Sequence, residues 1–211
     1  MGTIKKGILG GFSGSVGPVI GGSWKGIEYM RSQPSKRSGS STAAQIEQQL
    51  KFSLMMHFLQ TMTELFDETF RNYAIEMSAF NAAFSYNIKN AVTGTSPDFE
   101  VDYQHALVSR GDLPNAASPK ASVTSNTVFY TWADNSGAGS ALPTDEAVLA
   151  VYCKDMNSAV YSIGSAARSA GAASIDAAIF TGKEVNTWLG FISQNGKEVA
   201  NSIYTGALTV S

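Results

Sequence analysis

The chain has 211 residues, enough for one domain or for a large domain with a small appendage. Hydrophobic residues make up 44% of it, which excludes wholesale disorder. Charged residues make up only 15% and the formal net charge is −2, so the chain has no overall attraction to nucleic acid or anionic lipid.

The charge is divided unevenly along the chain. Residues 1–37 have a net charge of +5 and residues 38–211 a net charge of −7, which together give the overall −2. Such a basic arm often docks on an acidic surface, including that of another copy, and the alternative is a solvated tail. Trp24 and Tyr29 lie among the basic residues, but the positive charge is too sparse to favour nucleic-acid binding. The basic residues of the arm are Lys5, Lys6, Lys25, Arg31, Lys36 and Arg37.

Residues 7–24 follow two lysines and carry no charge, as in a signal peptide, but seven glycines and Pro18 make them a poor apolar helix. No A-x-A cleavage site follows, and no stretch of 18 predominantly apolar residues predicts a membrane span. Because Cys153 is the only cysteine, an intrachain disulfide is excluded. We expect the protein to be synthesised in the cytoplasm without a signal peptide. Its later location, in a virion or in the extracellular space after release, stays open.

Residues 1–41 are predicted to form a glycine-rich β arm followed by a linker. Between residues 7 and 33, large side chains alternate with small ones, and the glycines are too frequent for a helix, which favours short strands joined by glycine turns. Strands of this kind need a partner to cover them. The residues expected to form an assembly interface are Phe12, Val19, Ile20, Trp24, Tyr29 and Arg31.

Residues 42–95 are predicted to form a helical hairpin. Thr42 and Gln45 fit a capping box, and a helix of about 24 residues follows with an apolar row at a spacing of four. A second helix begins after a junction near residues 67–72, and Gly94 and Pro97 are expected to stop it. The apolar row consists of Ile46, Leu50, Leu54, Phe58 and Met62.

Residues 96–211 change to a period of two, which predicts an antiparallel immunoglobulin- or fibronectin-III-like β-sandwich. Trp132 and Trp188 fall at positions compatible with its core, and Asn195-Gly196 is a strong hairpin signal. The expected strands are 99–103 continuing through 106–109, 121–133, 147–154, 159–163, 173–179, 185–193 and 202–210. The fold class is therefore α+β.

The residue types and spacings that carry catalysis or metal binding are missing. The two histidines lie 48 residues apart, and no C-x-x-C, H-x-x-H or H-E-x-x-H spacing occurs. His57 is expected to pack on the apolar helix face, and His105 to pair with Asp102 at the surface without a nucleophile motif. The glycine-rich run matches neither G-x-G-x-x-G nor the phosphate loop. We therefore expect no enzyme, no catalytic residues, and no cofactor, metal or small-molecule substrate.

Several motifs are distributed over nearly the whole chain: residues 7–21, Trp24-Lys25-Gly26, residues 80–91, Ser109-Arg110-Gly111 and Ser202-x-Tyr204-x-Gly206. Together they resemble a family of uncharacterised bacterial proteins that is defined only as a domain of unknown function. The arm is also similar to parts of phage and prophage structural proteins, in which W-K-G…R…P…T-x-x-Q precedes a helix. Neither resemblance implies catalytic residues.

These observations favour a non-catalytic structural protein that self-assembles, or docks into a larger particle such as a virion or a surface filament, through its N-terminal arm. Its partners would be copies of itself or other structural subunits. The alternative is a monomeric binding or adhesion module whose sandwich loops hold a glycan or a protein ligand.

Overall fold

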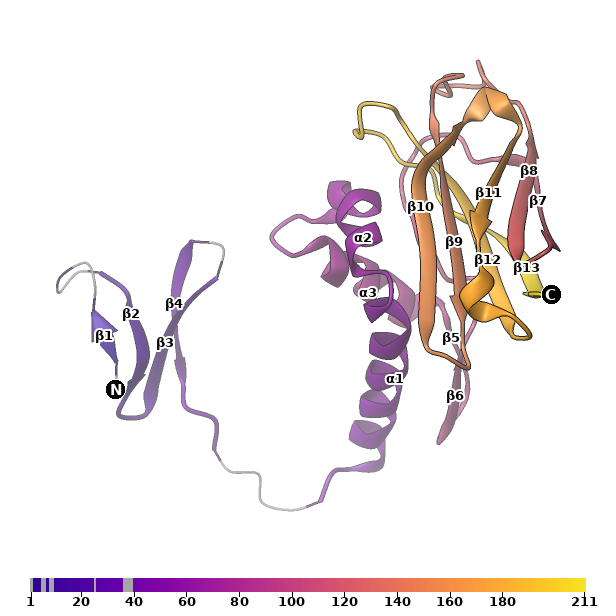
Figure 1. Ribbon diagram of the computed structural model, residues 1–211. Coiled ribbons are helices and arrows are strands. Elements are labelled where there is room, and N and C mark those ends of the chain that lie inside the picture. Colours follow the sequence, from indigo (N-terminus) through magenta and orange to yellow (C-terminus); the bar gives the residue numbers. More distant parts are fainter. Residues whose placement is uncertain (1, 5–6, 8–9, 25, 36–39) are drawn as a thin grey trace. The chain divides into compact units, whose positions relative to one another are not determined.

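The computed structural model describes residues 2–4, 7, 10–24, 26–35 and 40–211 (Figure 1). The chain divides into two compact units, Met1–Thr42 and Ala43–Ser211, which we call the arm unit and the body. Five of the six basic residues of the arm lie outside the described residues, namely Lys5, Lys6, Lys25, Lys36 and Arg37.

The arm unit is a four-stranded antiparallel sheet in the order β1-β2-β3-β4. Gly17 and Gly26, both at positive φ, lie in the turns before β3 and β4, where a side chain would be strained. The short strands and glycine turns expected from residues 7–33 are therefore present in the described part of the arm. The strands are β1 (Thr3–Ile4), β2 (Phe12–Val16), β3 (Val19–Trp24) and β4 (Ile27–Ser32).

The helical region of the body contains three α-helices and a short 3-10 helix. The expected long first helix is divided, because α1 ends at Gln60 and a separate α2 begins at Thr63. The last helix ends at Asn90, and Gly94 (φ +90°) lies within a β-hairpin instead of stopping the helix. The elements are α1 (Ala43–Gln60), α2 (Thr63–Thr69), η1 (Arg71–Tyr73) and α3 (Ala79–Asn90).

Two sheets of the body form an antiparallel sandwich, one in the order β10-β9-β12-β13 and the other in the order β11-β8-β7. The fourth strand of the sandwich, β10, pairs with the third, β9. A separate hairpin joins β5 to β6. The strands are β5 (Val92–Thr95), β6 (Asp98–Val101), β7 (Ala117–Thr124), β8 (Thr127–Ala133), β9 (Glu146–Cys153), β10 (Ser158–Ala167), β11 (Ala172–Asp176), β12 (Glu184–Ile192) and β13 (Ile203–Thr209).

Three of the expected strands differ in the structure, and one of them, 173–179, ends at Asp176 before a 3-10 helix, η3 (Ala178–Phe180). The run 121–133 is a hairpin, because Ser125 and Asn126 both adopt positive φ and turn the chain between β7 and β8. Residues 106–109 form a buried connection, in which the backbone N–H groups of Val108 and Ser109 donate to the Ser202 hydroxyl instead of to a neighbouring strand.

The body has three layers, with the four-stranded sheet in the middle (Figure 1). Along β9, Val148, Ala150 and Tyr152 pack with the helices, while Leu149 and Val151 pack with the three-stranded sheet. The two tryptophans expected in the core are both buried, Trp188 on the helix side and Trp132 between the sheets. The helices and the central sheet thus share one hydrophobic core, and the two sheets of the sandwich share a second.

Candidate functional site

The glycines of the arm sheet provide space for aromatic rings. A Cβ atom on Gly21 would lie 2.0 Å from the carbonyl oxygen of Phe12 and 2.7 Å from its ring. A Cβ on Gly22 would lie 3.1 Å from the ring of Tyr29, its cross-strand neighbour. Gly21 and Gly22 are therefore packing requirements, because each ring lies against a backbone that carries no side chain.

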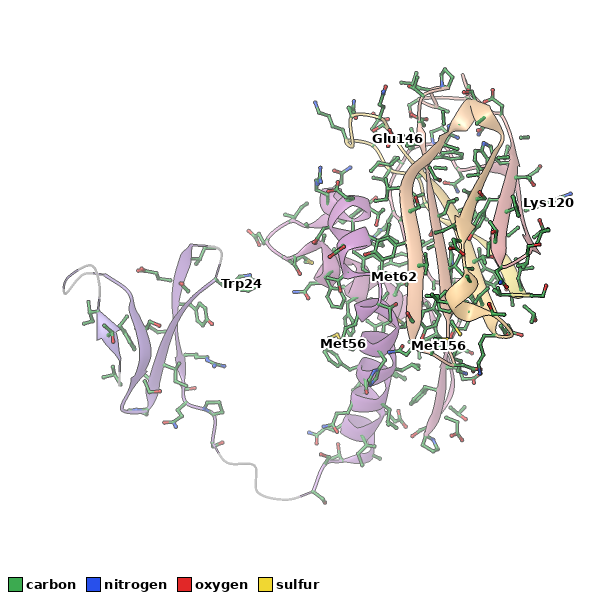
Figure 2. All side chains as sticks on the ribbon, viewed as in Figure 1. Trp24, Met56, Met62, Lys120, Glu146 and Met156 are labelled. Carbon is green, nitrogen blue, oxygen red and sulfur yellow. The ribbon has the colours of Figure 1, made fainter. Side chains whose placement is uncertain are left out.

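One face of the arm sheet, which we call the Trp24 face, carries four of the six residues expected at an assembly interface. Cross-strand partners project from the same face of a sheet. Trp24 pairs with Ile27, and Ile20 pairs with Arg31. Trp24 is 55% exposed and Ile27 is 67% exposed, and the side chain of Trp24 projects from the end of β3 (Figure 2). The Trp24 face consists of Ile20, Trp24, Ile27, Tyr29 and Arg31.

The opposite face, which we call the Phe12 face, carries the other two predicted residues. The pairings Ile4–Phe12 and Val16–Val19 assign it a second set of apolar side chains. The structure therefore does not bring the six residues into one patch, because neighbouring positions of a strand point to opposite faces. The Phe12 face consists of Ile4, Phe12, Val16, Val19 and Met30.

The outer edge of β4 is unpaired in the described part of the arm unit, since β4 is the last strand of its sheet. Its six residues, Ile27–Ser32, contain neither proline nor lysine, the residues that commonly prevent edge pairing. Of the side chains on β4, only Glu28 and Arg31 carry a charge, and Glu28 accepts a hydrogen bond from the Gly11 amide at 2.7 Å.

The two histidines do not form a catalytic arrangement within the described residues. His57 is exposed, which corrects its expected packing role, because the buried stripe of α1 passes through Met55, Phe58 and Leu59. His105 does pair with Asp102, at 2.7 Å between Nδ1 and Oδ2, in an exposed turn. Desolvation alone would raise the pKa of Asp102, but the hydrogen bonds and charge of His105, together with a hydrogen bond from the Gln104 amide, lower that pKa.

The most buried ionic cluster is structural. The Nε atom of Arg168 donates to Asp145 at 3.0 Å, and both side chains are almost wholly buried. Its other nitrogens donate to Asn135 and to the carbonyl of Pro114, and its guanidinium stacks on Phe191 at 3.9 Å. Because each nitrogen of the guanidinium has an acceptor, the cluster ties loops of the sandwich together.

The described residues hold neither a cluster of metal ligands nor a helix suited to span a membrane. They contain no group of three or more His, Cys, Asp or Glu side chains placed to hold a metal ion. None of their helices has the length and apolar character needed to cross a membrane.

Comparison with known protein families gives a match over most of the chain. A family model described as "Family of unknown function (DUF6266)" matches residues 11–206, which include the arm strands β2–β4 and nearly all of the body. A search among curated proteins found no match.

Proposed function

We propose that this chain, which belongs to the DUF6266 family of unknown function, is a non-catalytic structural subunit. It assembles with copies of itself through the arm unit. The observation that carries this proposal is a sheet with exposed apolar side chains on both of its faces.

A stable sheet buries at least one face against a second layer. The described residues of the arm unit contain no helix and no second sheet, and of its described strand residues only Gly21 is buried. Trp24 and Ile27 on one face and Met30 on the other are more than half exposed. Exposed apolar surface of this kind usually marks a contact with another molecule.

A second copy fits the unpaired edge of β4. Two β4 strands related by a two-fold axis can pair antiparallel, which makes one continuous sheet and satisfies the free backbone groups of both edges. The same pairing joins the two Trp24 faces side by side. Covering the exposed half of an aromatic side chain contributes roughly 2–3 kcal/mol before the cost of association is subtracted.

The expected product is a larger particle, such as a virion or a surface filament. An edge-to-edge contact alone closes as a dimer, while the apolar Trp24 and Phe12 faces provide the additional contacts that further growth requires. The sparse charge of the chain is compatible with such close packing, because few like charges oppose it.

The first test measures the mass of the full chain by light scattering coupled to size exclusion at tens of micromolar. We expect an oligomer, and we expect the double variant Trp24→Ser/Tyr29→Ser to shift it to the monomer because the Trp24 face loses its aromatic surface. The matched control is Phe129→Ser, which removes a phenylalanine that is 42% exposed on β8 of the sandwich.

Two results would contradict the proposal. If the full chain runs as a monomer throughout this concentration range, the arm unit does not assemble copies. If the double variant and the wild type form the same oligomer, the contact lies elsewhere in the chain, and loss of assembly in Phe129→Ser would place it on the sandwich.

The alternative function, a binding module that uses sandwich loops, is favoured by a separate observation. A cavity of about 330 Å³ lies where several loops of the body meet, and Asn72, Leu113, Ser140 and Glu198 line part of it. A wild-type monomer that binds glycans or proteins, and loses binding when Ser140 is replaced by a bulky residue, would support this alternative.

A further inference from the structure

Arg110 lies on a connection whose backbone is held rigidly. The N–H groups of residues 108–111 all donate hydrogen bonds of 2.9–3.3 Å, and their acceptors are Ser202, Thr69 and Asn201. The next residue, Gly111, approaches the backbone so closely that a Cβ would lie 2.0 Å from the carbonyl oxygen of Val199. The position of Arg110 is therefore fixed by the fold before any ligand arrives.

Two aromatic rings from different elements orient the Arg110 side chain. The guanidinium carbon lies 4.1 Å from the ring centre of Tyr73 in η1 and 4.7 Å from that of Tyr86 in α3. Contacts with tyrosine rings stabilise the cation and restrict its rotation. They do not satisfy the N–H groups of the guanidinium, which need oxygen acceptors.

Among the described residues, none accepts a hydrogen bond from the Arg110 guanidinium and none forms an ion pair with it. Arg168 shows the opposite arrangement, since all its nitrogens are occupied by Asp145, Asn135 and Pro114. Arg110 is thus a fixed and partly buried cation whose donors lack protein partners.

The cavity beside Arg110 has a volume of about 230 Å³ and contains a second cation. Lys89 lines it together with Tyr73, Tyr86 and the hydroxyl-bearing Ser85, and no carboxylate is among its described lining residues. Lys89 forms no ion pair within the described part of the chain. Lys89 lies in the last turn of α3, where the helix dipole favours a cation without any ligand. The inference therefore rests on Arg110.

We propose that this cavity binds an oxyanion, namely the phosphate or carboxylate group of a small ligand. The guanidinium supplies a fork of donors that matches two oxygens of such a group, and Lys89 adds a point charge. The Ser85 hydroxyl is a further donor at the cavity wall. The site is in the body and is independent of assembly through the arm unit.

The test uses the full chain and titrates inorganic phosphate and, separately, acetate at constant ionic strength, with the melting temperature as readout. We expect a saturable rise with at least one of the two anions. Arg110→Gln should weaken the apparent affinity about ten- to a hundredfold, and Lys89→Gln should weaken it less. The control is Lys120→Gln, which removes an exposed lysine that projects from β7 (Figure 2) and should leave the affinity unchanged.

A response to phosphate alone assigns the site to phosphate groups, and a response to acetate alone assigns it to carboxylates. The absence of a saturable response to both anions overturns the proposal, as does an equal response in Arg110→Gln. If Arg110→Gln does not fold, the same titrations are made with Arg110→Lys and Lys89→Gln. Wild-type anion affinity in both of these variants overturns the proposal.

Discussion

Five tyrosines of the body have hydroxyl groups whose ionisation the fold opposes, and the effect is largest for Tyr103, Tyr130 and Tyr152. Burial, with a smaller contribution from Cys153, raises the pKa of Tyr152 from 10.0 to about 12. Burial also raises the pKa values of Tyr103 and Tyr130 well above their usual range. The hydroxyl of Tyr130 donates to the carbonyl of Ala150 at 3.0 Å, a bond that requires the protonated form.

These shifts predict alkaline unfolding. In the unfolded chain the tyrosines lose their protons near pH 10, whereas the folded chain keeps them to higher pH. The contribution of these tyrosines to the free energy of unfolding is therefore fully present below pH 10. As the pH rises from 10 to 12, the free energy of unfolding falls, and the melting temperature should drop by several degrees. Tyr152→Phe should lose less between these pH values than the wild type, and an equal loss would show that Tyr152 does not contribute.

At the scale of the element, burial increases along α1. Ile46 near its start is 45% exposed, Leu50 and Leu54 are half-buried, and Phe58 and the following Met62 are fully buried. The ring of Phe58 lies 4.9 Å from that of Tyr152 and 6.0 Å from that of Trp188 in the central sheet. The helix is therefore fixed to the body by its C-terminal half.

This gradient predicts a graded mutational series. Phe58→Ala should cost about 3–5 kcal/mol of unfolding free energy because it leaves a cavity in the shared core. Leu54→Ala should cost about half as much, and Ile46→Ala less than about 0.5 kcal/mol, as for a surface position. Urea unfolding of the three variants measures the order, and equal costs at positions 46 and 58 would contradict the burial along α1.

At the scale of the whole molecule, the helices are one of three layers of the body. They cover the face of the central sheet that carries Val148, Tyr152 and Trp188, all of them buried. Without the helices this face would be a large exposed apolar patch on a four-stranded sheet.

Two fragments test the layer arrangement. Residues 43–211 should fold cooperatively, because this unit contains both hydrophobic cores. Residues 99–211 have all strands of the sandwich but expose the helix-side face, so we expect them to aggregate or to melt without cooperativity. Calorimetry compares the two fragments, and a sharp, reversible transition of residues 99–211 would show that the helices are dispensable.

Individual strands and turns can be predicted from the sequence because the alternation of side chains and the positions of glycines act over a few neighbouring residues. The alternation in residues 147–154 predicted β9 to within one residue, and the glycines between residues 7 and 33 predicted short strands with tight turns. The hairpin at Ser125-Asn126 was not predicted, because Asn126 adopts positive φ without the glycine that normally signals it.

The predicted arm residues illustrate the limit of the sequence. Phe12, Trp24 and Tyr29 were recognised as large side chains without a local partner, and they do lie in an exposed sheet. Their division between two faces depends on the pairing register, which the tight turns and cross-strand contacts decide together.

The sequence by itself determined the α+β class, the order of arm, helices and sandwich, and the residues that need burial, because periodicity and turn chemistry act over a few neighbouring residues. Only the tertiary structure decided that the helices cover the central sheet and that Arg110 meets Tyr73 and Tyr86. These partners lie 24 or more residues away along the chain. Contacts at that separation depend on how whole layers pack, and no local pattern encodes them.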